Sequence, residues 1–139
     1  MADAAAADNF LPSDLVTFLA THTEDIVVLK FGATWCGPCK KIKPVVDMWR
    51  KFHTATTNIR FVDIDVDESM ELYGALKKVK MVGGLPTMLA YYSDNRSRSH
   101  WFIPDDSVIG GDEGPVKAFF DRCAAKANHL VPHNYTYFT

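Results

Sequence analysis

Cysteine is scarce in this chain of 139 residues, and its distribution does not fit a secreted protein held together by disulfides. There are three cysteines, and only Cys36 and Cys39 lie close together in the sequence. Small secreted domains rely instead on several cysteine pairs spread along the chain. We therefore expect an intracellular protein, in the cytoplasm, with the nucleus as the alternative location.

The sequence also lacks a strong net charge and a long apolar run. Its formal net charge is −2, which gives no global attraction to nucleic acid or to a membrane surface. The apolar runs are far shorter than the roughly 20 residues that span a bilayer. Residues 1–9 contain no Lys or Arg and resemble neither a secretory signal nor a transit peptide, so we expect a flexible tail there. No nucleic-acid or membrane partner is expected.

Hydrophobic residues, by contrast, make up 47% of the chain, which is enough for one domain with a substantial core. We expect this domain to cover residues 10–129 and to be monomeric, with residues 130–139 as a C-terminal extension. The extension contains several aromatic residues and is expected either to pack over the sheet or to serve as a docking peptide.

The short segment from Trp35 to Cys39, with sequence WCGPC, places two thiols where a strand gives way to a helix. An apolar, β-branched run at 26–32 predicts a buried strand, and apolar residues at helical spacing predict a helix over 38–53. Pro38 suits the first turn of that helix, where its missing N–H costs nothing. Cys36 is thus expected at a helix N-terminus, which favours an anion, and the thiolate is the nucleophile of disulfide exchange. The pattern indicates a redox-active dithiol.

The remaining pattern predicts alternating helices and strands. A helix over 13–20 is expected to be capped by Ser13, and a strand over 59–65 to run parallel to the first strand. A strand over 87–92 is expected to pair antiparallel with residues 100–103 after a polar turn. Two more helices are expected over 68–78 and 114–128. Their predicted buried residues are Met70, Leu72, Tyr73 and Leu76 in the former, and Val116, Phe119, Phe120 and Cys123 in the latter.

The WCGPC segment resembles the active site of thioredoxins, and two further features support this resemblance. Pro44 lies five residues after Cys39, where thioredoxins kink their active-site helix, and the segment 84–87 (GLPT) resembles the family's cis-proline loop. The order of elements fits the family from about residue 10 to residue 127. The resemblance implies an α/β thioredoxin fold, a central mixed β-sheet flanked by helices on both faces.

The same resemblance implies a protein thiol–disulfide oxidoreductase that needs no cofactor. Cys36 would be the nucleophile and Cys39 the resolving thiol. Five residues would bind the substrate, with Trp35 shielding the dithiol and a cis Pro86 presenting the backbone of Leu85 to an extended client strand; they are Trp35, Gly37, Pro38, Leu85 and Pro86. The Gly-Pro pair is that of the family's reducing members. The expected partners are disulfide-containing client proteins and an upstream reductase such as a thioredoxin reductase.

The sequence departs from the thioredoxin pattern just before the dithiol. Six residues before the first cysteine, thioredoxins carry a buried Asp that assists proton transfer at the resolving thiol, and here that residue is Lys30. The lysine that usually pairs with this Asp maps onto Phe61. A charged lysine would lower the pKa of a nearby thiol, so Lys30 is a candidate modulator of the dithiol, paired with Asp63 or Asp65. The aromatic residue usual four positions before the first cysteine is Gly32.

Lys30, Phe31 and Gly32 also resemble the spliceosomal thioredoxin-like proteins of the Dim family. Those proteins use the fold as an interaction module, lack both the dithiol and the cis-proline, and carry a Tyr-rich C-terminal extension. The alternative function is therefore a protein-interaction module with a regulatory or vestigial dithiol. A further alternative, that the CxxC pair is half of a zinc site, is disfavoured because Cys123 and the scattered histidines do not supply the other ligands. No metal is expected.

Overall fold

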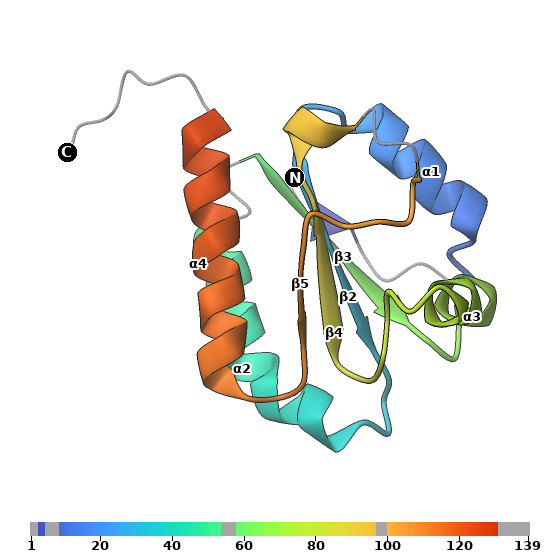
Figure 1. The fold of residues 1–139 in the computed structure, drawn as a ribbon. Coiled ribbons are helices and arrows are strands. Elements are labelled where there is room, and N and C mark those ends of the chain that lie inside the picture. Colours follow the sequence, from blue (N-terminus) through green and yellow to red (C-terminus); the bar gives the residue numbers. More distant parts are fainter. Residues whose placement is uncertain (1–2, 5–8, 54–57, 97–99, 131–139) are drawn as a thin grey trace.

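The computed structural model describes residues 3–4, 9–53, 58–96 and 100–130. Figure 1 shows a central sheet with helices on either side. In chain order the elements are β1 (Asp3–Ala4), α1 (Pro12–Thr21), β2 (Ile26–Gly32), α2 (Gly37–His53), β3 (Ile59–Asp65), α3 (Met70–Lys78), β4 (Thr87–Tyr91), a 3₁₀ turn η1 (Ser93–Asn95), β5 (Asp106–Ile109) and α4 (Glu113–Leu130).

The sheet has the order β1-β3-β2-β4-β5 and is mixed. β2 pairs in parallel with β3 over its whole length, and β3 also pairs in parallel with β1. β4 runs antiparallel to both of its neighbours, β2 and β5. The expected α/β fold with a mixed sheet is therefore confirmed, and so is the parallel crossover between the strands at 26–32 and 59–65.

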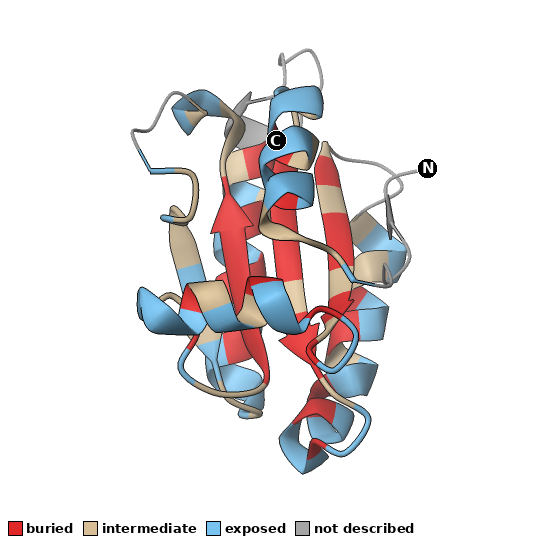
Figure 2. Ribbon diagram, turned by 90° about the vertical axis from the view of Figure 1, so that its right-hand side faces the viewer, coloured by how far each residue is buried: buried red, intermediate tan, exposed pale blue. Residues whose placement is uncertain are grey.

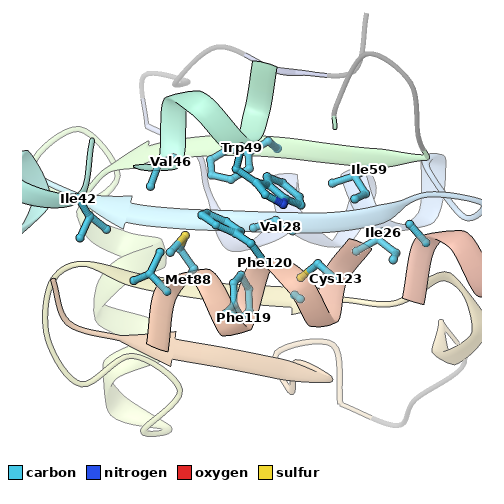
Figure 3. Close-up of a cluster of buried hydrophobic side chains, with 14 residues drawn as sticks. Ile26, Val28, Ile42, Val46, Trp49, Ile59, Met88, Phe119, Phe120 and Cys123 are labelled. Carbon is cyan, nitrogen blue, oxygen red and sulfur yellow. The ribbon is translucent and has the colours of Figure 1, made fainter. Parts of the chain in front are cut away.

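The alternation of side chains along each strand divides the core into two clusters, one on each face of the sheet. On one face α2 and α4 cover the sheet, and Figure 3 shows Trp49 from α2 and Phe120 from α4 close to each other and to Val28. The rings of Trp49 and Phe120 stack with centroids 4.4 Å apart. On the other face α1 and α3 cover the residues between those of the first cluster, such as Val27 and Leu29. Because both faces are covered, the central strands are buried along almost their whole length (Figure 2).

The helix that carries the dithiol matches its expected range. α2 runs from Gly37 to His53, with Pro38 in its first turn and Pro44 inside it. Its buried residues, Ile42, Val46 and Trp49 among them, follow the predicted helical spacing. The last helix, α4, is also confirmed, and its four predicted core residues are all buried: Val116, Phe119, Phe120 and Cys123.

The expected strand over 100–103 is wrong, because the antiparallel partner of β4 is β5. The pairing is set by Asp105, whose N–H donates to Ala90 O at 2.8 Å and whose carboxylate accepts from Tyr92 N at 2.6 Å. Trp101 and Phe102, whose apolar character suggested a strand, pack instead against the cluster beneath α1 and α3. These two side chains are thus partly buried by packing against that cluster, without joining the sheet.

Two helix predictions also need correction. α1 starts at Pro12, before Ser13, because Asp14 supplies the cap: its carboxylate accepts from Leu11 N at 2.8 Å. In α3, Leu72 and Leu76 are buried as predicted and Tyr73 is half-buried, but Met70 is 71% exposed. Met70 is the first residue of the helix and points away from the sheet side that the later turns cover.

Within residues 1–9, where a tail was expected, Asp3–Ala4 form the short strand β1 beside β3. The segment 130–139 lies outside the described residues except for Leu130, which ends α4. None of the helices in the described part of the chain is both long and apolar enough to cross a membrane.

Candidate active site

The two cysteines lie where β2 ends and α2 begins, at the lower edge of the sheet in Figure 1. The connecting loop closes on itself, since Cys36 N donates to Ala33 O at 3.2 Å and Lys40 N to Cys36 O at 3.3 Å. The backbone N–H of Cys39 donates to the Cys36 sulfur at 3.1 Å. Cys36 Sγ thus faces the N-terminal end of α2, where unpaired N–H groups and the helix dipole stabilise a thiolate.

Cys36 and Cys39 are joined by a disulfide, with Cα atoms 5.3 Å apart. Both residues are buried, with exposed fractions of 4% for Cys36 and 6% for Cys39. Around Cys36, by contrast, Trp35, Gly37 and Pro38 are exposed. The Cys36 sulfur, which would attack a client, is therefore shielded from bulk water, but the residues around it are accessible to a client protein.

The loop before β4 has the expected cis peptide bond between Leu85 and Pro86. Pro86 is buried and Leu85 is partly exposed. The carbonyl oxygen of Pro86 accepts from Gly110 N at 2.8 Å, and the hydroxyl of Thr87 donates to Gly84 O at 2.5 Å. These bonds fix the loop at the same edge of the sheet as the dithiol.

The segment after β5 belongs to this site as well, although no motif in the sequence points to it. A Cβ placed on Gly111 would lie 2.9 Å from both the Cβ and the carbonyl oxygen of Pro38. Ile109, just before, is 56% exposed and lies over Gly83 and Gly84 of the cis-proline loop. The segment thus bridges the dithiol helix and the loop of Pro86, and Ile109 adds an apolar side chain to the accessible surface. Only the tertiary contact reveals this, because Gly110 and Gly111 are far from Pro38 in the sequence and belong to no recognised motif.

The indole ring of Trp35 is held by a hydrogen bond to Asp67, which follows β3. Its indole Nε1 donates to the carboxylate of Asp67 at 2.8 Å, while its side chain remains 65% exposed. Asp67 is positioned in turn by its backbone N–H, which donates to Asp65 Oδ1 at 2.8 Å. The ring is therefore fixed in orientation but open to a client protein.

Lys30 lies behind the dithiol and pairs with Asp63, one of its two predicted partners. The two residues are opposite each other in the parallel register, and Lys30 Nζ lies 3.9 Å from Asp63 Oδ1. Asp63 also accepts from Arg50 at 2.5 Å. Phe61, onto which the family's lysine maps, is fully buried and lies opposite Val28. A basic residue on β2 and an acidic one on β3 thus take the place of the usual Asp–Lys arrangement.

Cys123 takes no part in this site. It is fully buried on α4 in the cluster with Trp49, and burial raises its pKa to about 12, so it stays a neutral thiol at ordinary pH. Among the residues that the structure describes, no group of three or more His, Cys, Asp or Glu side chains could hold a metal ion.

Comparison with known proteins adds to this geometry. The family model described as Thioredoxin matches residues 13–101, which is more than half of the chain. The chain belongs to the thioredoxin family. Together with the disulfide-linked pair Cys36–Cys39, this makes it a thiol–disulfide oxidoreductase of the protein-disulfide reductase type. Thioredoxins act on disulfide-containing substrates.

Individual thioredoxins show moderate similarity to the chain. The thioredoxin of Coprinus comatus is 32% identical over 105 residues, which are 76% of this chain and 87% of that protein. Thioredoxin-1 of Caenorhabditis elegans is 40% identical over 64 residues, which cover 46% of this chain and only 53% of the relative. Among solved structures, the crystal structure of the reduced Schistosoma mansoni thioredoxin pre-protein superposes on this chain with a TM-score of 0.62 at 25% sequence identity. The superposition covers 88% of this chain and 98% of the Schistosoma protein.

Proposed function

We propose that this thioredoxin reduces disulfides of client proteins and is returned to its dithiol form by an upstream reductase such as a thioredoxin reductase. The observation that carries the proposal is the placement of Cys36. Its sulfur lies at the start of α2, accepts a hydrogen bond from Cys39 N, and is within bonding distance of the Cys39 sulfur. Cys36 can therefore attack a client disulfide as a thiolate, and Cys39 is close enough to displace the client from the resulting mixed disulfide.

In the proposed cycle the reduced protein attacks with the Cys36 thiolate. Its sulfur forms a bond to one sulfur of the client disulfide, and the other client sulfur leaves as a thiolate that takes up a proton. Cys39 then attacks the Cys36 sulfur of this mixed disulfide, and the second client sulfur leaves. The client gains two electrons, the Cys36–Cys39 disulfide forms, and the reductase returns two electrons to the pair.

The exposed residues around Cys36 are proposed to bind the client. Trp35, Gly37 and Pro38 would contact it on one side of the sulfur, and the backbone at Leu85 and Pro86 would pair with an extended client strand on the other. A protein acting in this way needs no second copy, which supports a monomer. The scarcity of cysteine outside the reactive pair supports a cytoplasmic location, with the nucleus as the alternative.

Turbidity of insulin on reduction of its disulfides, with dithiothreitol as electron source, tests the proposal. The wild type is expected to accelerate precipitation, and Cys36→Ser to abolish the acceleration. Cys39→Ser is expected to stop resolution by the second thiol. When this variant is reduced, freed of dithiothreitol and mixed with insulin, it should form a stable mixed disulfide through Cys36, visible by mass spectrometry. Cys123→Ala is the matched control, because it removes a cysteine outside the pair and should leave the rate unchanged.

Absence of activity in the folded wild type, under conditions where an ordinary thioredoxin works, would contradict the proposal. The interaction-module alternative would then be favoured, since it needs the fold but not the exchange reaction.

A further inference from the structure

Lys30 and the resolving cysteine meet at a gap left by a glycine. A Cβ placed on Gly32 would lie 3.4 Å from Lys30 Nζ and 3.5 Å from Cys39 Sγ. Because glycine has no side chain, that position is empty, and the ammonium group and the sulfur flank it. The Lys30 side chain is only 15% exposed, so its charge is weakly screened by solvent.

The two sulfurs of the pair therefore have different sources of positive potential. Cys36 Sγ receives the N–H of Cys39 and the N-terminal end of α2. Cys39 lies further into the helix and lines a pocket of about 350 Å³ together with Lys30 and Gly32. The residues that line this pocket come from β2, α2, β3 and the loop between β2 and α2, and none of them belongs to the cis-proline loop. The pocket would give the Cys39 proton a route to water.

The other charged groups of the pocket determine how strongly Lys30 stabilises a negative charge on the Cys39 sulfur. α2 contributes Lys40, Lys43, Asp47 and Arg50, and β3 contributes Asp63 and Asp65. Lys43 is bound to Asp47 at 2.6 Å, and Arg50 to Asp63 at 2.5 Å. Lys30 Nζ is 3.9 Å from the other oxygen of the same Asp63 carboxylate, outside hydrogen-bond distance. The closer cation on Asp63 is Arg50, so the carboxylate only partly compensates Lys30.

We propose that Lys30 stabilises the anionic form of the resolving thiol Cys39, and that Arg50 supports this role by engaging Asp63. This extends the proposed function, on which its catalytic meaning rests, to the second step of the cycle. Cys39 would lose its proton to water in the pocket and attack the Cys36 sulfur as a thiolate, and the client sulfur would leave. No carboxylate is needed to take the proton, because the nearby ammonium group makes the anion available at neutral pH.

A chain with Cys39 as its single active-site thiol, Cys36→Ser, allows a direct test. The readout is the ultraviolet absorbance of the thiolate as a function of pH, corrected with the double variant C36S/C39S. In this background Lys30→Met is expected to lower the thiolate fraction at pH 7 about tenfold. Lys30→Arg keeps the charge and should stay near the parent, whereas Asp63→Asn should raise the fraction.

Lys43→Met is the matched control. It removes a lysine that lines the same pocket but is neutralised by Asp47 and is 70% exposed, so little change is expected. Lys30→Met should fold, because Asp63 keeps Arg50 as a partner, and circular dichroism checks this. Equal titration of Lys30→Met and parent, or an equal shift with Lys43→Met, would overturn the proposal.

These outcomes are independent of the reductase assay. An inactive wild type would contradict the proposed function while leaving the Cys39 titration to be judged on its own. A normal titration shift with normal insulin reduction supports both. Active wild type with an unshifted Lys30→Met titration removes only the role of Lys30.

Discussion

Gly111 lies so close to Pro38 that no side chain fits between them. A Cβ at position 111 would be 2.9 Å from the Pro38 carbonyl oxygen and 3.1 Å from its Cα. Both neighbours on the Pro38 side are backbone atoms of the first turn of α2. The segment after β5 therefore fixes the position of the dithiol helix, with Gly110 N bound to Pro86 O at its other end.

Gly111→Ala is expected to lower both stability and activity. The added methyl group must push apart the segment at 110–111 and the start of α2, which costs about 1–3 kcal/mol of unfolding free energy. The same displacement moves Cys36 relative to Pro86 and should reduce kcat/KM for insulin. Urea unfolding and the turbidity assay measure the two effects.

Gly74→Ala is the control for this substitution. Gly74 lies inside α3 with no atom within 4 Å of the added Cβ, so the change should stabilise the protein by about 0.5–1 kcal/mol and leave activity unchanged. If Gly111→Ala changed stability and activity in the same way as Gly74→Ala, the close contact between Gly111 and Pro38 would contribute nothing to the unfolding free energy or to the activity.

Strong periodicity explains why much of the fold could be predicted. β2 and β3 are continuous apolar or alternating runs, and α2 and α4 present regular apolar faces, so their existence and approximate bounds follow from local sequence. The strand β5 could not be found in this way. It is four residues long, is partly exposed and contains Asp106 and Ser107, whereas the more apolar residues Trp101 and Phe102 nearby serve the core without joining the sheet.

The candidate site also contains features that local sequence predicts and features that only tertiary contacts determine. The WCGPC segment and the cis-proline loop are local motifs, so their resemblance to the family's motifs is visible in the sequence. The contact of Gly111 with Pro38 and the position of Lys30 beside Cys39 depend on how distant or opposed backbone segments approach. The alternation of side chains along the strand puts Asp63 and Asp65 on the same face and does not distinguish them as partners of Lys30, whereas the register of β2 against β3 places Asp63 opposite Lys30.

Cys123 is expected to be unreactive in the folded protein. Burial, aided by the nearby Asp106 charge, raises its pKa to about 12, and its side chain is fully enclosed. Iodoacetamide should therefore label no cysteine in the oxidised native protein and one cysteine, Cys123, after denaturation in urea. Mass spectrometry of the intact chain counts the labels. Labelling of Cys123 without denaturant would contradict its burial.

His22 is expected to make the protein less stable in mildly acidic solution. Partial burial, followed by the charge of Arg60, lowers its pKa below 6.5, and the attraction of Asp25 only partly offsets this. The unfolded chain then binds a proton more readily than the folded one. Its effect on stability is absent above pH 6.5 and grows as the pH falls from there through the lowered folded pKa.

Urea unfolding at several pH values between 7.5 and 5 checks the contribution of His22. The wild type should lose stability relative to His22→Gln over this range, whereas the two should follow parallel curves above pH 7. Parallel curves for wild type and His22→Gln over the whole range would exclude a contribution from this residue.

The hydrogen bond from Trp35 to Asp67 is expected to matter for client binding more than for stability. Asp67→Ala frees an indole ring that is 65% exposed, so the cost in unfolding free energy should be about 1 kcal/mol or less. A ring free to rotate beside Cys36 presents a less defined surface, so kcat/KM for insulin should fall several-fold, mainly through KM. Asp67→Asn keeps an acceptor oxygen for the indole N–H and should retain most of the activity. If Asp67→Ala and Asp67→Asn lost activity equally, the negative charge of Asp67 rather than its hold on Trp35 would be the feature that clients recognise.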